Sequence, residues 1–189
     1  MIITISGSPG SGKSTIGQLL AKKLGFKRYS LGDLQRRLAK DNGMTIEQWN
    51  EFCYNNAIAD KNADEFQRRL GQVEDNFVID GRVSWFFIPQ SFKVFLKVDD
   101  AVAAKRIFED HAKGKRDSES KVASLSDVLK EIKTRQKNEL ARYKKAYNIN
   151  YADLKNYDLV LDTTQLTIPQ TLNAVLAAMK TVKSKKKVA

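Results

Sequence analysis

A loop that could bind phosphate groups lies near the start of the chain, at Gly7-Ser8-Pro9-Gly10-Ser11-Gly12-Lys13-Ser14. It matches the pattern G-x-x-x-x-G-K-[ST], in which glycines let the main chain turn so closely that several N–H groups point at one anion. Lys13 would act in catalysis by contacting the β- and γ-phosphates of a nucleoside triphosphate, and the Ser14 hydroxyl would coordinate Mg²⁺. We therefore expect residues 7–15, which include Thr15, to bind ATP and Mg²⁺. The competing interpretation is a glycine-rich turn that only precedes a helix.

The sequence around this loop has the context that the motif requires. Residues 1–6 are rich in isoleucine, which indicates a strand buried on both faces, as in a parallel sheet. After the loop, apolar residues recur at helical spacing until Gly25, a residue typical of a helix C-terminus. Strand, loop and helix thus follow one another as in a nucleotide-binding site.

A second candidate for metal binding is Asp80, which ends the apolar run Phe77-Val78-Ile79. An acid at the carboxyl end of a parallel strand faces the ligand in open α/β sheets. Together with Ser14, Asp80 would hold Mg²⁺ or a water bound to that ion. The alternative is that Asp80-Gly81 is simply a turn.

Further strand-length apolar runs alternate with helical patterns along the chain. The runs lie at 76–80, 92–98 and 157–161, and helices are expected over 31–40, 45–57, 61–72, 101–108 and 125–147, with a last helix capped by Thr167. Strands separated by helices imply βαβ crossovers and a parallel sheet covered on both faces. We predict one α/β domain over residues 1–189, with the three-layer α/β/α architecture of P-loop NTPases.

Composition and charge limit the class of protein. A chain of 189 residues with 42% hydrophobic residues suits one folded domain, and its first apolar run is too short for a signal peptide or a membrane span, so we expect a cytoplasmic protein. A single cysteine, Cys53, and a single histidine, His111, cannot form an internal disulfide or a structural zinc site. The net charge is +11, and five lysines lie in residues 180–189. We interpret these residues as a solvated basic tail rather than a nucleic-acid site.

The order of several motifs resembles that of the nucleoside monophosphate kinases, most closely the archaeal-type cytidylate kinases. The similar stretches run over nearly the whole chain, at residues 2–24, 29–36, 79–82 and 157–163, at Asp60, Asp64 and Gln67, and at Arg142-Tyr143 and Tyr147. The resemblance implies a helical insertion that binds the monophosphate at about residues 31–75 and a lid at about residues 109–124. It also implies that the acceptor is bound by Gly32, Asp33, Arg36, Asp60, Asp64, Gly81 and Arg82, with the two arginines on its phosphate group.

Two arginines on the expected long helix are open to two interpretations. Arg135 and Arg142 are seven residues apart and share one helical face, where Glu131 and Glu139 are spaced for intrahelical ion pairs. That pattern is typical of a salt-bridged surface helix. In similar kinases, however, arginines beside the lid neutralise the transferring phosphoryl group, which implies a catalytic role. Arg36 could likewise be only a solvated helix residue.

The glycine loop predicts transfer of the terminal phosphoryl group of ATP, and the resemblance implies a nucleoside monophosphate, CMP or dCMP, as the acceptor. The acceptor phosphate is already an anion near neutral pH, so no general base is needed. The resemblance is less complete at Trp85-Phe86-Phe87, a bulky segment that is either core or a wall against the base.

Two other functions stay open. One is a kinase for another small metabolite, with Asp33 as the base, and the other is a nucleotide-dependent ATPase that binds RNA or the ribosome through its tail. Our leading expectation is a monomer that binds small nucleotides and neither membrane nor nucleic acid.

Overall fold

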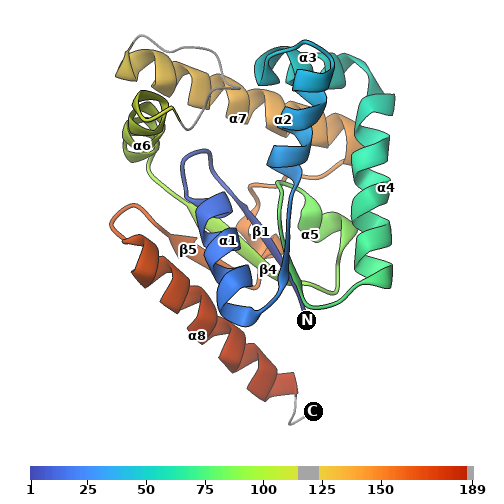
Figure 1. Cartoon of the computed structure of the whole chain (residues 1–189), viewed down its shortest axis with the longest axis vertical. Coiled ribbons are helices and arrows are strands. Elements are labelled where there is room, and N and C mark those ends of the chain that lie inside the picture. The colour runs from blue at the N-terminus through green and yellow to red at the C-terminus, as the bar shows by residue number, and fades with distance from the viewer. Residues whose placement is uncertain (115–123, 187–189) are drawn as a thin grey trace.

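A parallel β-sheet forms the centre of the molecule (Figure 1). The structure is a computed structural model that describes residues 1–114 and 124–186, with side chains apart from those of 57–60 and 182–186. Its strands are β1 (Ile2–Gly7), β2 (Lys27–Ser30), β3 (Phe77–Asp80), β4 (Phe92–Lys97) and β5 (Leu159–Asp162). They lie in the order β2-β3-β1-β4-β5, and every neighbouring pair is parallel. The predicted α/β fold with a parallel sheet is therefore confirmed.

Helices connect the strands and cover both faces of the sheet. They are α1 (Lys13–Leu24), α2 (Leu31–Asp41), α3 (Ile46–Asn55), α4 (Ala57–Val73), α5 (Ser84–Phe87), α6 (Asp100–Ala112), α7 (Leu125–Tyr147) and α8 (Ile168–Lys186), with a 3-10 turn at Leu154–Asn156. Side chains alternate across a strand, so the two faces of β1 pack against different helices. Ile3 and Ile5 join one buried cluster with Val175 of α8, and Ile2 joins another with Leu70 of α4.

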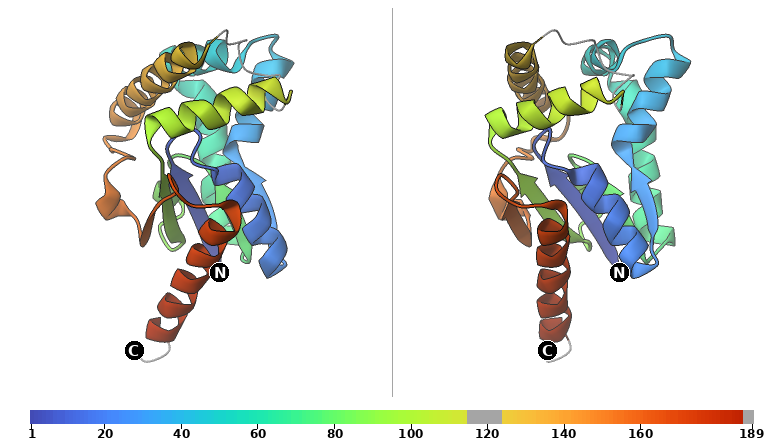
Figure 2. Two further views of the ribbon diagram at one scale, coloured as in Figure 1. Left: turned by 90° about the vertical axis from the view of Figure 1, so that its left-hand side faces the viewer. Right: turned by 60° about the vertical axis from the view of Figure 1, so that its left-hand side comes forward.

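The strand ends bring the candidate site residues together. Asp80 at the end of β3 is in register with Ile5 of β1 on one side and with Ser30 of β2 on the other. The glycine loop leaves the same end of the sheet, and α2, α3, α6 and α7 gather beyond it (Figures 1 and 2). Helix α8 runs to the opposite end, where the C-terminus lies. The carboxyl end of the sheet is thus the end at which a ligand would bind.

Besides the 3-10 turn at Leu154–Asn156, β2 and α5 were not predicted. The four residues of β2, Lys27–Ser30, form an edge strand with no buried residue and no apolar run, so the usual strand signal is absent. Helix α5 is four residues long, too short for a helical period to appear. The predicted capping box is confirmed, since Thr45 accepts from the Gln48 N–H and the Gln48 side chain accepts from the Thr45 N–H.

Some predicted boundaries shift. Helix α4 begins at Ala57 rather than Lys61, and α6 continues to Ala112, so the first residues of the expected lid are helical. Residues 115–123 of that lid lie outside the described residues. Residues 180–186 of the lysine-rich tail belong to α8. Among the helices of the described ranges, none combines the length and the hydropathy needed to cross a membrane.

Candidate active site

The glycine loop has a conformation that residues with a side chain could not adopt without strain. Gly7 has φ 144° and lies so close to β4 that an added Cβ would stand 2.0 Å from the Leu96 carbonyl oxygen. Gly10 has φ 70° and would meet Ala103 of α6 at 2.9 Å. At the start of α1, Gly12 provides no side chain to cap the helix. The first N–H groups of α1 thus point into the loop without a side-chain cap, as an anion-binding loop requires.

Lys13 places a cation inside this loop. Its Nζ donates to the Ser8 carbonyl oxygen at 2.6 Å, so the side chain folds back over the loop. Burial, together with the nearby positive charge of Arg82, holds the pKa of Lys13 well below its usual range. A bound phosphate would restore the preference for the charged amine, because an adjacent anion favours the protonated form.

Asp80 lies where the sequence analysis expects a metal ligand. It is 4% exposed and accepts hydrogen bonds from the Ser14 hydroxyl at 3.1 Å, the Ser30 hydroxyl at 2.9 Å and the Arg28 guanidinium at 2.8 Å. The hydroxyl of Ser14 and the carboxylate of Asp80 are oxygen ligands of the kind that Mg²⁺ takes, usually keeping several waters. Among the described residues no cluster of three or more His, Cys, Asp or Glu side chains could hold a metal ion, so this pair is compatible with Mg²⁺ but not with a dedicated protein cage.

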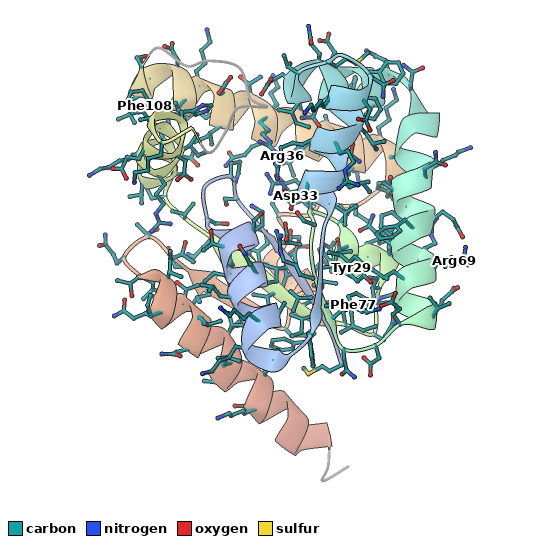
Figure 3. The ribbon with its side chains drawn as sticks, viewed as in Figure 1. Tyr29, Asp33, Arg36, Arg69, Phe77 and Phe108 are labelled. Atoms are coloured by element: carbon teal, nitrogen blue, oxygen red, sulfur yellow. The ribbon has the colours of Figure 1, made fainter. Side chains whose placement is uncertain are left out.

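Arg28 is a site residue that the sequence analysis missed. It lies on β2, pairs with Asp80 and also reaches Asp33 at 3.4 Å. Asp33 in turn accepts from Arg36, one turn further along α2 (Figure 3). The arginine thus links the predicted metal carboxylate to the helix predicted to bind the acceptor.

A pocket joins the loop to α2, α3, α4 and α7. Most predicted site residues line it, namely Pro9, Gly10, Lys13, Ser14, Gly32, Arg36, Asp64, Asp80, Gly81, Arg82, Arg135 and Arg142. Asp33 is not among the lining residues and is exposed beside Arg36, and the side chain of Asp60 lies outside the described part of the chain. The pocket therefore brings a triphosphate loop and several arginines into one space.

Arg82 and Arg135 are held by one buried acid, Glu139. Glu139 accepts from Arg82 Nε at 2.6 Å, from Arg135 Nε at 3.0 Å and from the Tyr151 hydroxyl at 3.2 Å. Burial alone would raise the pKa of Glu139, but the two guanidinium groups hold it well below its usual range. Arg82 also donates to the Gly7 carbonyl oxygen at 2.7 Å, which ties it to the glycine loop. The ion pair between Arg135 and Glu139 expected of a salt-bridged helix is present, but Glu139 is 9% exposed and therefore does not lie on the surface.

Two of the three aromatic residues in the bulky segment after Arg82 are buried, whereas Phe86 is 38% exposed. Trp85 and Phe87 are 8% and 7% exposed, and Phe87 packs in the cluster behind the sheet with Ile88. None of Trp85, Phe86 and Phe87 lines the pocket. The core interpretation holds for Trp85 and Phe87. The pocket lining does not support the alternative in which these aromatic residues form a wall against the base.

Comparisons with known sequences agree on one family. A model of the cytidylate kinase-like family matches residues 2–165. The cytidylate kinase of Archaeoglobus fulgidus is 34% identical over 186 residues, which cover 98% of this chain and 98% of that protein. The cytidylate kinase of Methanosphaera stadtmanae is 33% identical over 175 residues, covering 93% and 95%.

Other similar proteins differ in length or in name. An S-adenosylmethionine-dependent nucleotide dehydratase of Lacinutrix mariniflava is 34% identical over 178 residues, but the match covers only 35% of that longer protein. Among solved structures, an uncharacterised protein from Eubacterium ventriosum has a TM-score of 0.67 at 18% identity, covering 95% of this chain and 98% of that one. A shikimate kinase from Bacteroides thetaiotaomicron has a TM-score of 0.60 at 14% identity, with the same coverage. The solved structures establish the fold, the family model and the full-length relatives establish the kinship, and the chain therefore belongs to the cytidylate kinase-like family and is a kinase with the P-loop fold.

Proposed function

We propose that this chain transfers the terminal phosphoryl group of ATP to a nucleoside monophosphate, with CMP or dCMP as the acceptor. The names of its full-length relatives support the cytidine nucleotide as acceptor. The single observation that carries the proposal is the pocket in which Lys13 and the arginines Arg36, Arg82, Arg135 and Arg142 face the same space. Such a concentration of cations suits two phosphate-bearing substrates that must approach each other.

The loop and Lys13 would bind the triphosphate. The uncapped amides at the start of α1 and the Nζ of Lys13 would neutralise its terminal phosphate groups. Ser14 and Asp80 would hold Mg²⁺, which supplies further charge neutralisation when it is bound.

Arginines from three elements would orient and neutralise the acceptor and the transferred group. Arg36 on α2 and Arg82 after β3 would bind the acceptor phosphate, with Gly32 and Gly81 beside them. Arg135 and Arg142 on α7 would neutralise the transferring phosphoryl group. Glu139 fixes Arg82 and Arg135 before a substrate arrives, which reduces the reorganisation needed for catalysis.

A kinase for an alcohol-bearing metabolite is less well supported. Such an enzyme needs a carboxylate free to accept the proton of the alcohol. Asp33, the candidate base, is bound to Arg36 and Arg28 and does not line the pocket. Among the described acids that line the pocket, Asp80 and Glu139 are paired with arginine, and Asp64 accepts from the Tyr147 hydroxyl.

The test is an ADP-release assay with Mg²⁺ and ATP over a panel of nucleoside monophosphates and small alcohol acceptors. We expect CMP and dCMP to stimulate ADP release most and Lys13→Ala to abolish that release. Stimulation by an alcohol metabolite alone, or by RNA alone, would replace the proposed acceptor with the corresponding alternative. We also propose a monomer, because both anion sites lie in one pocket of one chain, and sedimentation equilibrium would reveal a dimer if it exists.

A further inference from the structure

A buried glutamine on α4 has a carbonyl oxygen that is left without a donor. Gln67 is 3% exposed and lines the pocket on the wall that α4 contributes, across α2 from the glycine loop (Figure 1). Its Nε2 donates to the Ala63 carbonyl oxygen at 3.1 Å. Exchanging the two ends of the amide would set two oxygens against each other, so this bond fixes Oε1 as the group left over. Within the described residues, Oε1 is buried and accepts no hydrogen bond.

An unsatisfied buried acceptor costs free energy unless a ligand supplies the donor. Buried polar atoms in folded proteins are nearly all paired, and the exceptions call for a functional explanation. Gln67 does not touch the described ion pairs that hold Arg82 and Arg135, so the phosphate sites do not explain it. Its location in the pocket lining points to a substrate group other than a phosphate, since an anion would meet the lone pairs of a carbonyl oxygen.

Asp64 gives the same wall a second acceptor. It lies three residues before Gln67, on the same side of α4, and is 8% exposed. The Tyr147 hydroxyl on α7 donates to Asp64 Oδ2 at 2.6 Å, so the carboxylate is the acceptor in that bond. The described α4 residues that line the pocket, Ala63, Asp64 and Gln67, therefore present acceptor oxygens and no cation to the part of the substrate that reaches them.

We infer that Gln67 reads the base of the acceptor, with its Oε1 taking a hydrogen bond from the exocyclic amino group of cytosine beside the carboxylate of Asp64. Cytosine carries a donor amino group where uracil carries an acceptor oxygen. Uracil would set its oxygen against Gln67 Oε1 and leave both unpaired, which is the arrangement that polar sites reject most strongly. The wall thus selects CMP over UMP, an inference that rests on the proposed function and specifies its base preference.

The first test compares kcat/KM for CMP and UMP in the wild type and in Gln67→Met, which removes the acceptor oxygen at similar volume. We expect the CMP-to-UMP ratio to fall by about 10- to 100-fold, chiefly through a loss with CMP. Gln90→Met is the matched control, because Gln90 Nε2 makes the same kind of bond to a carbonyl of α4, that of Gly71 at 2.7 Å, outside the pocket lining. This control should keep the wild-type ratio.

A second test changes the substrate and can be carried out on the wild type alone. The 5′-monophosphate of 2-pyrimidinone riboside lacks the amino group, so the wild type should use it about 10- to 100-fold less well than CMP, whereas Gln67→Met should use the two about equally. If Gln67→Met does not fold, equal use of CMP and this analogue by the wild type overturns the inference. An unchanged ratio in a folded Gln67→Met, or a wild type that uses UMP as well as CMP, overturns it while the proposed kinase function stands. If no nucleoside monophosphate is turned over by the wild type, the proposed function fails and the inference fails with it.

Discussion

At the scale of single residues, Glu139 shows how one acid can organise two arginines. Glu139 and Arg82 are both about one-tenth exposed at their side chains, so neither charge is well solvated without the other. Removing one partner of a buried ion pair leaves an uncompensated charge in a medium of low dielectric constant. Here the same removal would also free Arg135, which lies one turn before Glu139 on α7.

Glu139→Gln should therefore lower both stability and turnover. We expect the free energy of unfolding to fall by about 3 kcal/mol in urea titrations and kcat to fall at least about tenfold. Glu65→Gln is the control, since Glu65 pairs with Arg68 at 3.8 Å on the surface and should change stability by less than about 0.5 kcal/mol. Equal effects of the two substitutions would contradict the role of Glu139.

The depressed pKa of Glu139 gives this prediction a pH signature. A carboxyl whose folded-state pKa is lowered adds stability that is fully present above the unfolded-state pKa and is lost as pH falls through the folded-state pKa. The difference in unfolding free energy between wild type and Glu139→Gln should thus be largest near neutral pH and shrink below about pH 4. A difference that stays constant on acidification would mean that the charge of Glu139 is not what stabilises the fold.

Lys13 makes the opposite prediction. Burial and Arg82 lower its folded-state pKa, so the charged amine destabilises the ligand-free protein, and the penalty disappears as pH rises toward the ordinary lysine value. Lys13→Met should abolish ADP release yet raise the unfolding free energy at neutral pH. That gain should narrow between about pH 7 and about pH 10 in parallel denaturant titrations of both proteins. A Lys13→Met variant that is less stable than the wild type at neutral pH would contradict the prediction that the charged amine destabilises the ligand-free protein.

Sequence reasoning reaches some of these residues and not others. The loop residues around Lys13 are adjacent in sequence, and their main-chain requirements can be seen from glycine and lysine types alone. Glu139 looked like a surface partner of Arg135 because its contact with Arg82 spans 57 positions of the chain. Arg28 was missed for a similar reason, since its buried partner Asp80 meets it only after β2 and β3 have paired.

At the scale of elements, the capping box of α3 connects helix stability to the pocket. Ile46 and Asn50 of α3 line the pocket, and Ile46 and Trp49 bury α3 against α2. Helix α8 begins with a similar box, in which the Thr167 N–H donates to Gln170 Oε1 and the Gln170 N–H donates to the Thr167 hydroxyl. The two boxes have the same chemistry, and neither Thr167 nor Gln170 lines the pocket.

Thr45→Ala and Thr167→Ala should then separate stability from acceptor binding. Each should cost about 1 kcal/mol of unfolding free energy, because each removes one helix cap. Only Thr45→Ala should raise the KM for CMP, since it loosens a wall of the pocket. Equal KM values for the two variants would show that the start of α3 does not shape the acceptor site.

Hydrophobic periodicity predicts long elements well and short edge elements poorly. Helix α7 was predicted with the bounds Leu125–Tyr147 that the structure has, because a long amphipathic helix repeats its signal over many turns. Strand β2 has only four residues at the sheet edge, and its place depends on β3 offering a neighbour. Such a strand is fixed by tertiary pairing rather than by its own composition.

At the scale of the whole molecule, the lysine-rich end of the chain lies away from the proposed ligand site. The ligand site lies at the carboxyl end of the sheet, whereas α8 carries the lysine-rich end of the chain to the other end (Figure 2). Met179 is 4% exposed and belongs to the core, whereas the next two residues, Lys180 and Thr181, are exposed. The alternation of strands and helices along the chain made the parallel sheet predictable from the sequence. The order in which the strands lie side by side in the sheet could not be predicted in this way.

Deleting residues 180–189 should leave kinase turnover within about twofold of the wild type, because α8 runs away from the end of the sheet where the pocket lies (Figure 2). The deletion removes five of the lysines that contribute to the net charge of +11. The weak binding of single-stranded RNA expected at low salt should lose most of its salt dependence, with no effect of RNA on ADP release. If the deletion abolished turnover while the protein stayed folded, or if RNA stimulated the full chain, the ATPase alternative would gain support.

The junction of β2 and α2 connects the start of α2 to Asp80 through one hydroxyl group. Strand β2 ends at Ser30 and α2 begins at Leu31, with no intervening loop residue. The Ser30 hydroxyl accepts from the Asp33 N–H at 3.3 Å and donates to Asp80 at 2.9 Å. A swing of α2 at this point would break one of those bonds and shift the carboxylate beside Ser14. We therefore expect any displacement of α2 to be transmitted to Asp80, the proposed metal carboxylate, through the Ser30 hydroxyl.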